Sequence, residues 1–167
     1  MVKASVTQRS GESTATCQAE IRPFIPLPMD ELRKVSSTYG PKIVAYCQAN
    51  LGKKVGDGEC WTLGRLSFES AGCAPPISKN FGQEIPLSEA APGDVLQMES
   101  CVFEYPDGRK AMAGFPDHTA VVCDYPRGNV IPVLEQNPKP VSYGSYDFTG
   151  LKSGSFKLYR ALPPQYK

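Results

Sequence analysis

The chain of 167 residues contains a single histidine and has no CxxC pair. A structural zinc site would have to be assembled from widely separated cysteines, so we expect no metal and no cofactor. No apolar run approaches the roughly 18 residues of a membrane span, and the opening stretch MVKASVTQRSGESTATC lacks the apolar core of a signal peptide. These absences favour a cytoplasmic protein; a secreted one would require a signal peptide that has been removed.

An excess of charge of one sign is also missing. The formal net charge is +1, with 21% charged and 41% hydrophobic residues. A balance so close to neutral gives no general attraction to nucleic acid or to an anionic membrane, so we expect neither as a partner. The length suits one domain with a hydrophobic core of its own.

The six cysteines show no short repeated spacing. An even number is compatible with a secreted, disulfide-bonded effector or defence protein, but a chain of this length does not need bridges. We expect most of the thiols to be small buried hydrophobic groups. They are Cys17, Cys47, Cys60, Cys73, Cys101 and Cys123.

The N-terminal part, residues 1–36, is interpreted as a proline-containing arm. Its segment IRPFIPLPMDEL carries Pro23, Pro26 and Pro28, a spacing that favours an extended or polyproline conformation. The arm either lies across the domain surface or forms a loose linker. As a polyproline ligand, residues 21–28 would offer a site for a protein partner. Residues 37–163 are expected to form the domain, and residues 164–167 a C-terminal tail.

Two helices are predicted ahead of the strands. The stretch STYGPKIVAYCQANLG predicts a helix that begins at Pro41 and ends near Gly52. The stretch ECWTLGRLSFESAG predicts a second helix from Glu59 to Ala71, ended by Gly72. Gly64 inside this helix either weakens the helix prediction or marks close packing against another element.

Strand patterns dominate after residue 92. PGDVLQM leads into a strand that SCVFEY continues or pairs with, and SGSFKLYRAL predicts a last strand. HTAVVCDY (118–125) and NVIPVLEQN (129–137) are β-rich runs separated by PRG, which predicts a hairpin. Pro132 favours an edge position or a bulge. Helices followed by antiparallel strands predict an α+β fold, with N-terminal helices packed on an antiparallel sheet.

Cys60 lies between the turn VGDG and the predicted start of the second helix. A thiol in the first turn of a helix faces unpaired N–H groups and the positive end of the helix dipole, which favour the reactive thiolate. Gly56 and Gly58 permit a tight entry turn and a close approach to a substrate. The alternative is a structural cysteine near a helix start.

His118 supplies the base that a cysteine nucleophile needs, and it is placed at the start of a strand after the loop GFPD. If its strand pairs with 129–137, the open end of the hairpin brings His118 near residue 136. Side chains two apart share a face of a strand, so Glu135 and Asn137 point one way and Gln136 points the other. Either Glu135 or Asn137 would then orient the imidazole.

The order of these motifs resembles the papain-like fold of the NlpC/P60 and CHAP amidohydrolases. The matching stretches are GDGECW, APGDVLQ, DHTAVV and VLEQN, and the resemblance covers about residues 40 to 160. The PGD strand and the closing segment SYDFTGLKSGSFKLYRAL also resemble the cysteine-proteinase-fold domain of fungal actin-patch proteins. The first resemblance implies a catalytic triad, and the second implies a domain that sits in a cytoskeletal adaptor.

These observations lead to two main functional hypotheses. The first is a cysteine peptidase or amidohydrolase that cleaves a peptide or other amide substrate through an acyl-enzyme. In it Cys60 attacks, His118 acts as base and then acid, and the Cys60 N–H contributes to the oxyanion hole. The second is a non-catalytic protein-interaction module on the same fold. Residues expected to bind the substrate are Gly58, Glu59, Trp61, Phe115 and Asp117, with Phe103 and Tyr105 as further candidates for the cleft wall. For the aromatic residues the alternative is ordinary packing in the core or in a loop.

Overall fold

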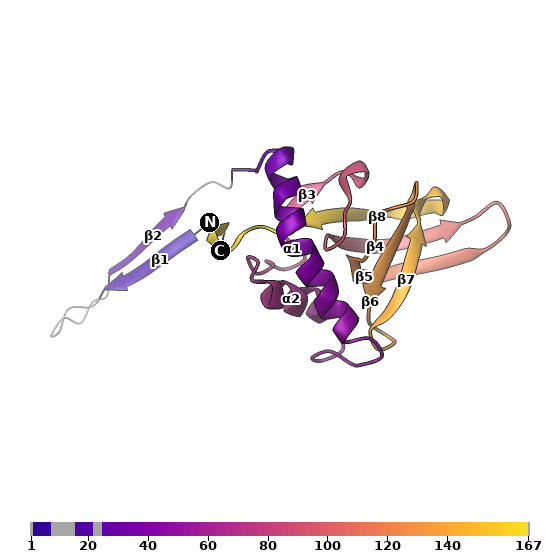
Figure 1. Ribbon diagram of the computed structural model, residues 1–167, viewed down its shortest axis with the longest axis horizontal. Coiled ribbons are helices and arrows are strands. Elements are labelled where there is room, and N and C mark those ends of the chain that lie inside the picture. Colours follow the sequence, from indigo (N-terminus) through magenta and orange to yellow (C-terminus); the bar gives the residue numbers. More distant parts are fainter. Residues whose placement is uncertain (1, 8–15, 22–24, 167) are drawn as a thin grey trace.

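A computed structural model describes residues 2–7, 16–21 and 25–166, with side chains described from residue 25 onward. Two helices cover a six-stranded sheet whose strand order is β3-β8-β4-β5-β6-β7 (Figure 1). Every described pairing in this sheet is antiparallel. The predicted α+β fold is therefore confirmed.

The helices and strands follow the chain in a simple order. A two-stranded sheet of β1 (Val2–Thr7) and β2 (Thr16–Ile21) comes first. The body then comprises α1 (Met29–Ala49), α2 (Cys60–Ala71), β3 (Gln83–Ile85), β4 (Val95–Glu104), β5 (Lys110–Val122), β6 (Val130–Glu135), β7 (Ser142–Asp147) and β8 (Leu151–Arg160). Short 3₁₀ turns lie at Leu87–Glu89, Phe148–Gly150 and Pro164–Tyr166.

Helix α1 begins at Met29 rather than at Pro41, so this predicted start is wrong. Leu32 and Val35 are buried on the same helix as Ile43. Burial of this apolar face on both sides of the proline outweighs the loss of one intrahelical donor at Pro41. The helix therefore includes residues that the sequence pattern assigned to the arm.

The described end of the predicted arm is held to the sheet. The Leu27 N–H donates to Gln83 Oε1 at 2.8 Å, and Gln83 Nε2 donates to the Leu27 carbonyl at 2.9 Å. Leu27 also packs against the hydrophobic core, whereas Ile25 is exposed. The chain at residues 25–28 thus lies against the domain, while residues 22–24 of the arm fall outside the described part.

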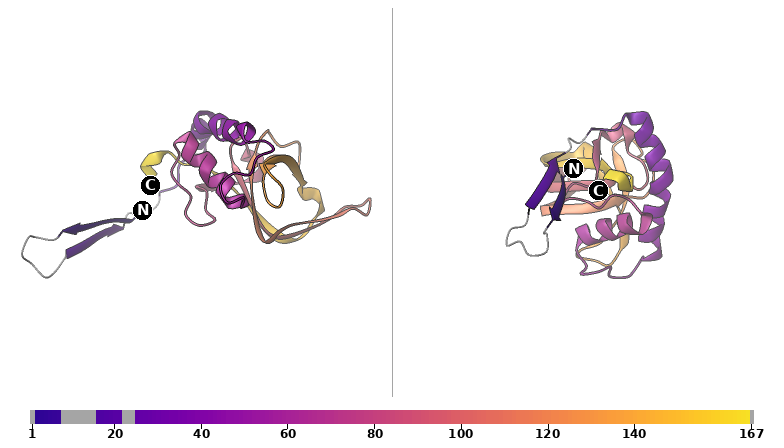
Figure 2. Two further views of the ribbon diagram at one scale, coloured as in Figure 1. Left: turned by 90° about the horizontal axis from the view of Figure 1, so that it is seen from below. Right: turned by 90° about the vertical axis from the view of Figure 1, so that its left-hand side faces the viewer.

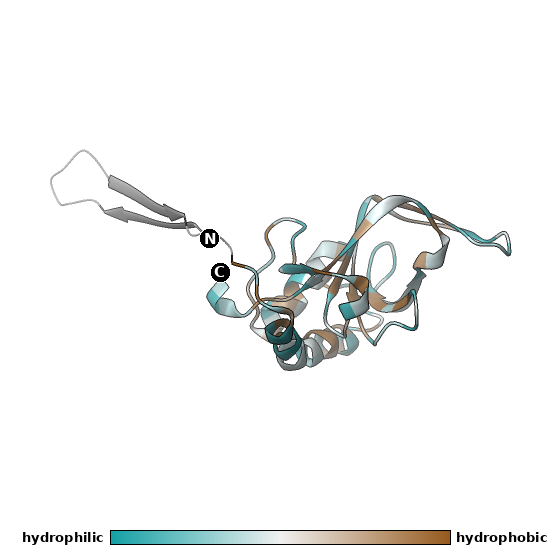
Figure 3. Ribbon diagram, turned by 90° about the horizontal axis from the view of Figure 1, so that it is seen from above, coloured by the Kyte–Doolittle hydropathy of each residue, from teal (hydrophilic) through white to brown (hydrophobic). Residues whose placement is uncertain are grey.

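Strands β4 and β5 form a long hairpin from the segment that separates the PGD motif from His118. β5 begins at Lys110, so His118 lies within the strand. The prediction that His118 is at the start of its strand is therefore wrong. The pairing shifts register between Glu99 and Cys101, opposite the bulged stretch 114–116. Figure 3 shows that the tip of this hairpin is hydrophilic, whereas the strand segments nearer the helices are hydrophobic. The hairpin thus carries His118 at its inner end and solvent-exposed chain at its outer end.

Pro132 lies in β6, between β5 and β7, and not on an edge strand. The Cys123 N–H donates to the Pro132 carbonyl, so this carbonyl faces the β5 side. The N–H of a strand residue points to the same side as its carbonyl, so the donor that proline lacks would also have faced β5. The recorded β5–β6 pairs are only Val121 with Leu134 and Val122 with Val133. The proline therefore costs little, because it sits where this short ladder ends.

Two hydrophobic clusters lie on the two faces of the sheet. One packs α1 and α2 against residues such as Val121 and Leu134, and the other includes Phe103 and Leu158. Figure 2 shows the two helices side by side on one face of the sheet. Neither helix of the described chain combines the length and hydropathy needed to cross a membrane.

The PGD motif ends in a buried ion pair. Arg160 donates to both carboxylate oxygens of Asp94, at 2.9 and 2.8 Å, and Asp94 also accepts from the Ala91 N–H. Both side chains are almost fully buried, so removing either partner would leave an uncompensated charge. The motif therefore fixes the start of β4 to the end of β8.

Candidate active site

Cys60 is the first residue of α2, where the sequence places it. Gly56 and Gly58 adopt positive φ angles of 58° and 92°, which glycine tolerates. Asp57 Oδ1 accepts the Glu59 N–H at 3.0 Å and closes the turn before the helix. The first N–H groups of a helix have no intrahelical acceptor, so the Cys60 backbone presents a donor beside its own thiol.

Close packing fixes the position of α2. A Cβ at Gly64 would lie 2.8 Å from the Phe81 ring and 3.3 Å from Thr119 Cγ2. The helix ends at Gly72, which has a left-handed φ of 79°. Both features agree with the sequence prediction for this helix. Since Thr119 directly follows His118, the packing also sets the distance between α2 and the strand that carries the histidine.

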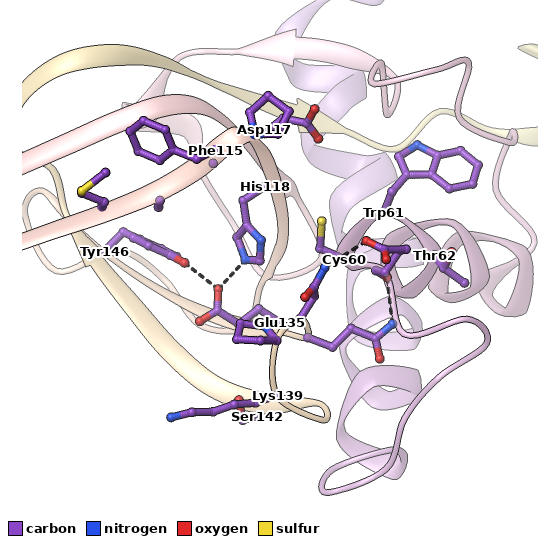
Figure 4. A pocket seen from close by; sticks show the side chains of 18 of the residues that line it. Cys60, Trp61, Thr62, Phe115, Asp117, His118, Glu135, Lys139, Ser142 and Tyr146 are labelled. Carbon is purple, nitrogen blue, oxygen red and sulfur yellow. Dashed lines mark hydrogen bonds and ion pairs between the residues drawn. The ribbon is translucent and has the colours of Figure 1, made fainter.

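His118 lies between Cys60 and Glu135 (Figure 4). Its Nε2–H donates to Glu135 Oε2 at 2.8 Å, and the Cys60 thiol lies beside its ring (Figure 4). With Nε2 engaged by the carboxylate, Nδ1 is the nitrogen left for the sulfur. The side chain is 9% exposed, so the chain of three groups is largely shielded from water.

The short ladder between β5 and β6 explains why these groups meet. After the Val121–Leu134 pair the two strands separate, and His118 and Glu135 lie at the opening. Asn137 has a left-handed φ of 75°, so the alternation of side chains ends before it. Its Nδ2 donates to Glu59 Oε2 at 2.9 Å, so the Asn137 amide is engaged by the loop before α2, whereas Glu135 is bonded to the imidazole.

Gln136 links the end of β6 to the loop before Cys60. Its Oε1 accepts the Val55 N–H at 3.0 Å, and its Nε2 donates to the carbonyls of Val55 and Glu59 at 3.0 and 2.8 Å. The side chain points away from Glu135, as the strand alternation predicted. These bonds hold the loop that starts α2 against the strand that supplies the carboxylate.

The electrostatics favour a thiolate–imidazolium pair. Burial disfavours ionisation of Cys60, but hydrogen bonds from His118 and from the Thr119 N–H outweigh it and lower the pKa of the thiol. Burial acts against the imidazolium too, yet the bonds with Cys60 and Glu135 raise the pKa of His118 to about 9. Despite its burial, the pKa of Glu135 is lowered by the donors His118 and Tyr146.

The other described cysteines have the opposite character. Burial raises the pKa of Cys47 and of Cys73 to about 12, and it raises the pKa of Cys101 and Cys123 as well. All five cysteines with described side chains are free thiols. The expectation of small buried groups thus holds for Cys47, Cys73 and Cys101, whereas Cys123 is half-buried and the side chain of Cys17 lies outside the described part.

A cavity of about 820 Å³ opens over Cys60 and His118. Among the residues predicted to bind a substrate, Glu59, Trp61, Phe115 and Asp117 line it, but Gly58 does not. Figure 4 shows Phe115 and Asp117 on the strand that carries His118, and Trp61 on α2. Sequence reasoning missed the opposite wall, which includes Lys139, Ser142, Tyr143 and Tyr146.

Two predicted cleft walls lie elsewhere. Phe103 is buried in the core, where it packs against Phe148, and Tyr105 donates its hydroxyl proton to the Asp147 carbonyl. They belong to the part of the β4–β5 hairpin that lies beyond the register shift. The prediction that they wall the cleft is therefore wrong.

The rim of the cavity carries fixed acidic groups. Asp117 pairs with Lys79 at 2.7 Å, and Glu59 is held by Asn137. Trp61 is oriented by a 2.6 Å hydrogen bond from its Nε1 to the Ser78 carbonyl. In the described part of the chain, no group of three or more His, Cys, Asp or Glu side chains is arranged to hold a metal ion.

Three contributors to the site were not found from the sequence. Thr119 was passed over because its role depends on a backbone N–H, which any residue supplies. Gln136 was noted only as the side chain facing away from Glu135. Tyr146 lies in SYGSYD, a stretch with no apolar alternation, which was not predicted to be a strand.

Comparison with known proteins identifies a family and two relatives of this chain. The model of the AIM3/BBC1 cysteine proteinase-fold domain matches residues 17–167. Altered inheritance of mitochondria protein 3 of Debaryomyces hansenii is 31% identical, over 92% of this chain and 20% of that protein. A Schizosaccharomyces pombe protein named as an SH3 domain-containing protein is 25% identical, over 97% of this chain and 11% of its own length.

The chain thus spans a fifth or less of the curated relatives it matches. No solved structure matches it significantly. The resemblance to the cysteine-proteinase-fold domain of fungal actin-patch proteins agrees with this family match.

Proposed function

The chain belongs to the AIM3/BBC1 cysteine proteinase-fold domain family, and from the arrangement of its site residues we propose that it is a thiol hydrolase of peptide or other amide bonds. Cys60 is the nucleophile, His118 the acid–base group and Glu135 the residue that orients the imidazole. The observation that carries the proposal is the placement of the Cys60 thiol beside His118, whose Nε2 is bonded to Glu135, with all three residues lining one cavity. A structural cysteine needs neither a base nor an opening.

In the acylation step the Cys60 thiolate attacks the carbonyl carbon of the amide. A C–S bond forms, and the carbonyl oxygen becomes an oxyanion beside the Cys60 N–H at the start of α2. When the C–N bond breaks, the His118 imidazolium gives its Nδ1 proton to the leaving nitrogen. The products of this step are a free amine and a thioester on Cys60.

Deacylation uses the same groups in reverse. Neutral His118 takes a proton from a water molecule whose oxygen attacks the thioester carbonyl, and the C–S bond then breaks. The thiolate–imidazolium pair is regenerated and a carboxylic acid leaves. Glu135 supports both steps, because it stabilises the imidazolium and keeps Nδ1 directed at the sulfur.

A comparison of wild type with Cys60→Ala and His118→Ala against a panel of peptide and acyl amides tests this proposal. The wild type should release amine, and both variants should lose that activity while remaining folded. Tyr125→Phe is a control, since the Tyr125 side chain is exposed and does not line the cavity. Activity that survives both substitutions would exclude the mechanism.

The names and lengths of the relatives favour a second candidate, a protein-interaction module of the cytoskeletal-adaptor type. One relative is named as an SH3 domain-containing protein, and the matched region is a small share of each relative. The proline-rich segment 21–28 would be the ligand, because SH3 domains bind PxxP segments in polyproline conformation. Pro23 and Pro26 have this spacing.

Titration of the whole chain with an isolated SH3 domain of that relative tests the second candidate. Binding that is lost with Pro23→Ala and Pro26→Ala, but kept in Cys60→Ala, would support an adaptor role for the arm. Equal binding by the proline variants would exclude the segment as the ligand.

A further inference from the structure

The Glu135 carboxylate is supported by strand β7 in a way that the hydrolase proposal does not use. In the β6–β7 register Glu135 lies opposite Ser142, while Tyr146 lies opposite Ile131. The carboxylate nevertheless accepts a hydrogen bond from the Tyr146 hydroxyl at 2.7 Å. The side chain of Glu135 therefore runs along β7 rather than straight across to its partner.

Gly144 provides the space for this path. A Cβ at position 144 would lie 3.1 Å from Glu135 Cδ and closer still to Oε1. The φ of Gly144 is outside the left-handed region, so the backbone does not itself require glycine there. What the position requires is the absence of a side chain under the carboxylate.

Tyr146 fixes the far end of the same carboxylate. Its hydroxyl and His118 Nε2 donate to one oxygen, Oε2, at 2.7 and 2.8 Å. Burial and the nearby charge of Glu135 raise the pKa of Tyr146, so the phenol remains a donor at neutral pH. Its ring packs 6.2 Å from Phe103 and 6.4 Å from the imidazole, between ring centres, which restricts its movement.

We propose that Gly144 and Tyr146 form a carboxylate seat, a pair of positioning residues that hold Glu135 against His118. Residues two apart share a face of a strand, so β7 presents the bare glycine and the phenol on the same side. Gly144 admits the carboxylate, and Tyr146 directs Oε2 at the imidazole. The role of the seat in catalysis rests on the proposed function. The positioning of Glu135 against His118 does not depend on it.

The single histidine makes the seat measurable without any substrate. His118 gives the only imidazole signals in an NMR titration, so its pKa can be followed in each variant without assignment of the ring. Glu135→Gln removes the carboxylate charge and should lower the pKa of His118 by about 1 to 2 pH units. Gly144→Ala should lower it by a similar amount, because the methyl group displaces the carboxylate.

Tyr146→Phe keeps the ring and removes the hydroxyl. The carboxylate keeps its charge but loses one of two constraints on Oε2, so the pKa of His118 should fall by less than in Gly144→Ala. Tyr125→Phe is the control, since Tyr125 is exposed and does not line the cavity, and it should leave the pKa of His118 unchanged.

The double variant Gly144→Ala/Glu135→Gln separates a positioning role from general disturbance. If Gly144 acts through the carboxylate, adding Gly144→Ala to Glu135→Gln should not shift the His118 pKa further. A further fall of the His118 pKa in the double variant would overturn the seat. So would a His118 pKa equal to that of the wild type in both Gly144→Ala and Tyr146→Phe. Thermal melts establish that each variant is folded, and Tyr146→Phe keeps the test open if Gly144→Ala does not fold.

These readouts distinguish the seat from the proposed function. Shifted His118 titrations in a protein that cleaves no amide would uphold the seat and reject hydrolysis. An active enzyme whose His118 titration is indifferent to Gly144 and Tyr146 would reject the seat alone.

Discussion

Cys60 and Cys47 lie on neighbouring helices and are almost equally buried, at 7% and 0% exposure, yet their thiols differ in character. Burial opposes ionisation of both. Cys60 stands at the start of α2 with His118 and the Thr119 N–H as donors, whereas Cys47 lies in the last turn of α1, where the helix dipole disfavours an anion. A side-chain hydrogen bond with Ser67 does not offset the burial of Cys47. Burial alone therefore does not decide the direction in which the pKa of a thiol shifts; the donors around the sulfur also do.

The largest expected effect is the difference in amide hydrolysis between a variant at Cys60 and a variant at Cys47. Cys60→Ser should lower amide hydrolysis by at least about 10³-fold, since a hydroxyl in this site does not ionise near neutral pH. Cys47→Ala should keep the activity and cost about 1 kcal/mol of unfolding free energy, the scale of one buried methyl-sized group. Rate assays and urea melts measure the two effects. Equal losses of activity would remove the functional distinction between the thiols.

Thiol labelling sharpens the same comparison without a substrate. At neutral pH iodoacetamide should modify Cys60 at least about 100-fold faster than Cys47 or Cys73, because the pKa of the first thiol is lowered and the others are raised to about 12. Peptide mass spectrometry after short exposure gives the site-specific rates. Labelling of Cys60 no faster than a free cysteine in a short peptide would contradict an activated nucleophile.

The pH dependence of amide cleavage should differ from the pH dependence of Cys60 alkylation. Cys60 becomes a thiolate as pH rises through its lowered pKa, and His118 loses its proton as pH rises through about 9. Amide cleavage needs the thiolate together with the imidazolium, so kcat/KM should fall above about pH 9. Alkylation needs only the thiolate and should not fall there. A decline of both rates at the same pH would point to unfolding instead of titration of His118.

Thr119→Val should give the smallest effect. The substitution keeps the backbone N–H that faces Cys60 and the methyl group near Gly64, but removes the hydroxyl, which donates to Gln97 Oε1 at 2.8 Å and so holds Thr119 in place beside the thiol. Loss of one hydrogen bond should slow alkylation of Cys60 by about 3- to 10-fold below its pKa. Thr119→Ser keeps the hydroxyl and serves as the control. A greater loss in Thr119→Ser than in Thr119→Val would show that packing, and not the hydroxyl, matters.

Local signals were sufficient for much of the fold and for two groups of the site. The glycines around Cys60 and the terminal Gly72 marked α2, and the alternation near His118 marked the β5–β6 hairpin. Local signals did not suffice for α1. Proline favours the first turn of a helix, but the burial of Leu32 and Val35 extends α1 well before Pro41. Burial against a distant sheet is not visible in a local window.

The choice between Glu135 and Asn137 was beyond the sequence for a related reason. Strand alternation places both on one face, and only the separation of β5 from β6 and the left-handed turn at Asn137 decide between them. Tyr146 could not be anticipated at all, because its role depends on the β6–β7 pairing that brings its hydroxyl to Glu135 and its ring beside the histidine. The roles assigned to these residues in catalysis stay predictions until the variants are measured.

The register shift between Glu99 and Cys101 has a practical consequence for protein engineering. Because the outer half of the β4–β5 hairpin is offset from the inner half, a change in loop length at residues 105–110 need not slide His118 along its strand. The exposed tip is thus a natural insertion point for a tag or a short binding peptide. The same independence means that the length of this tip can change while the position of His118 beside Cys60 is kept.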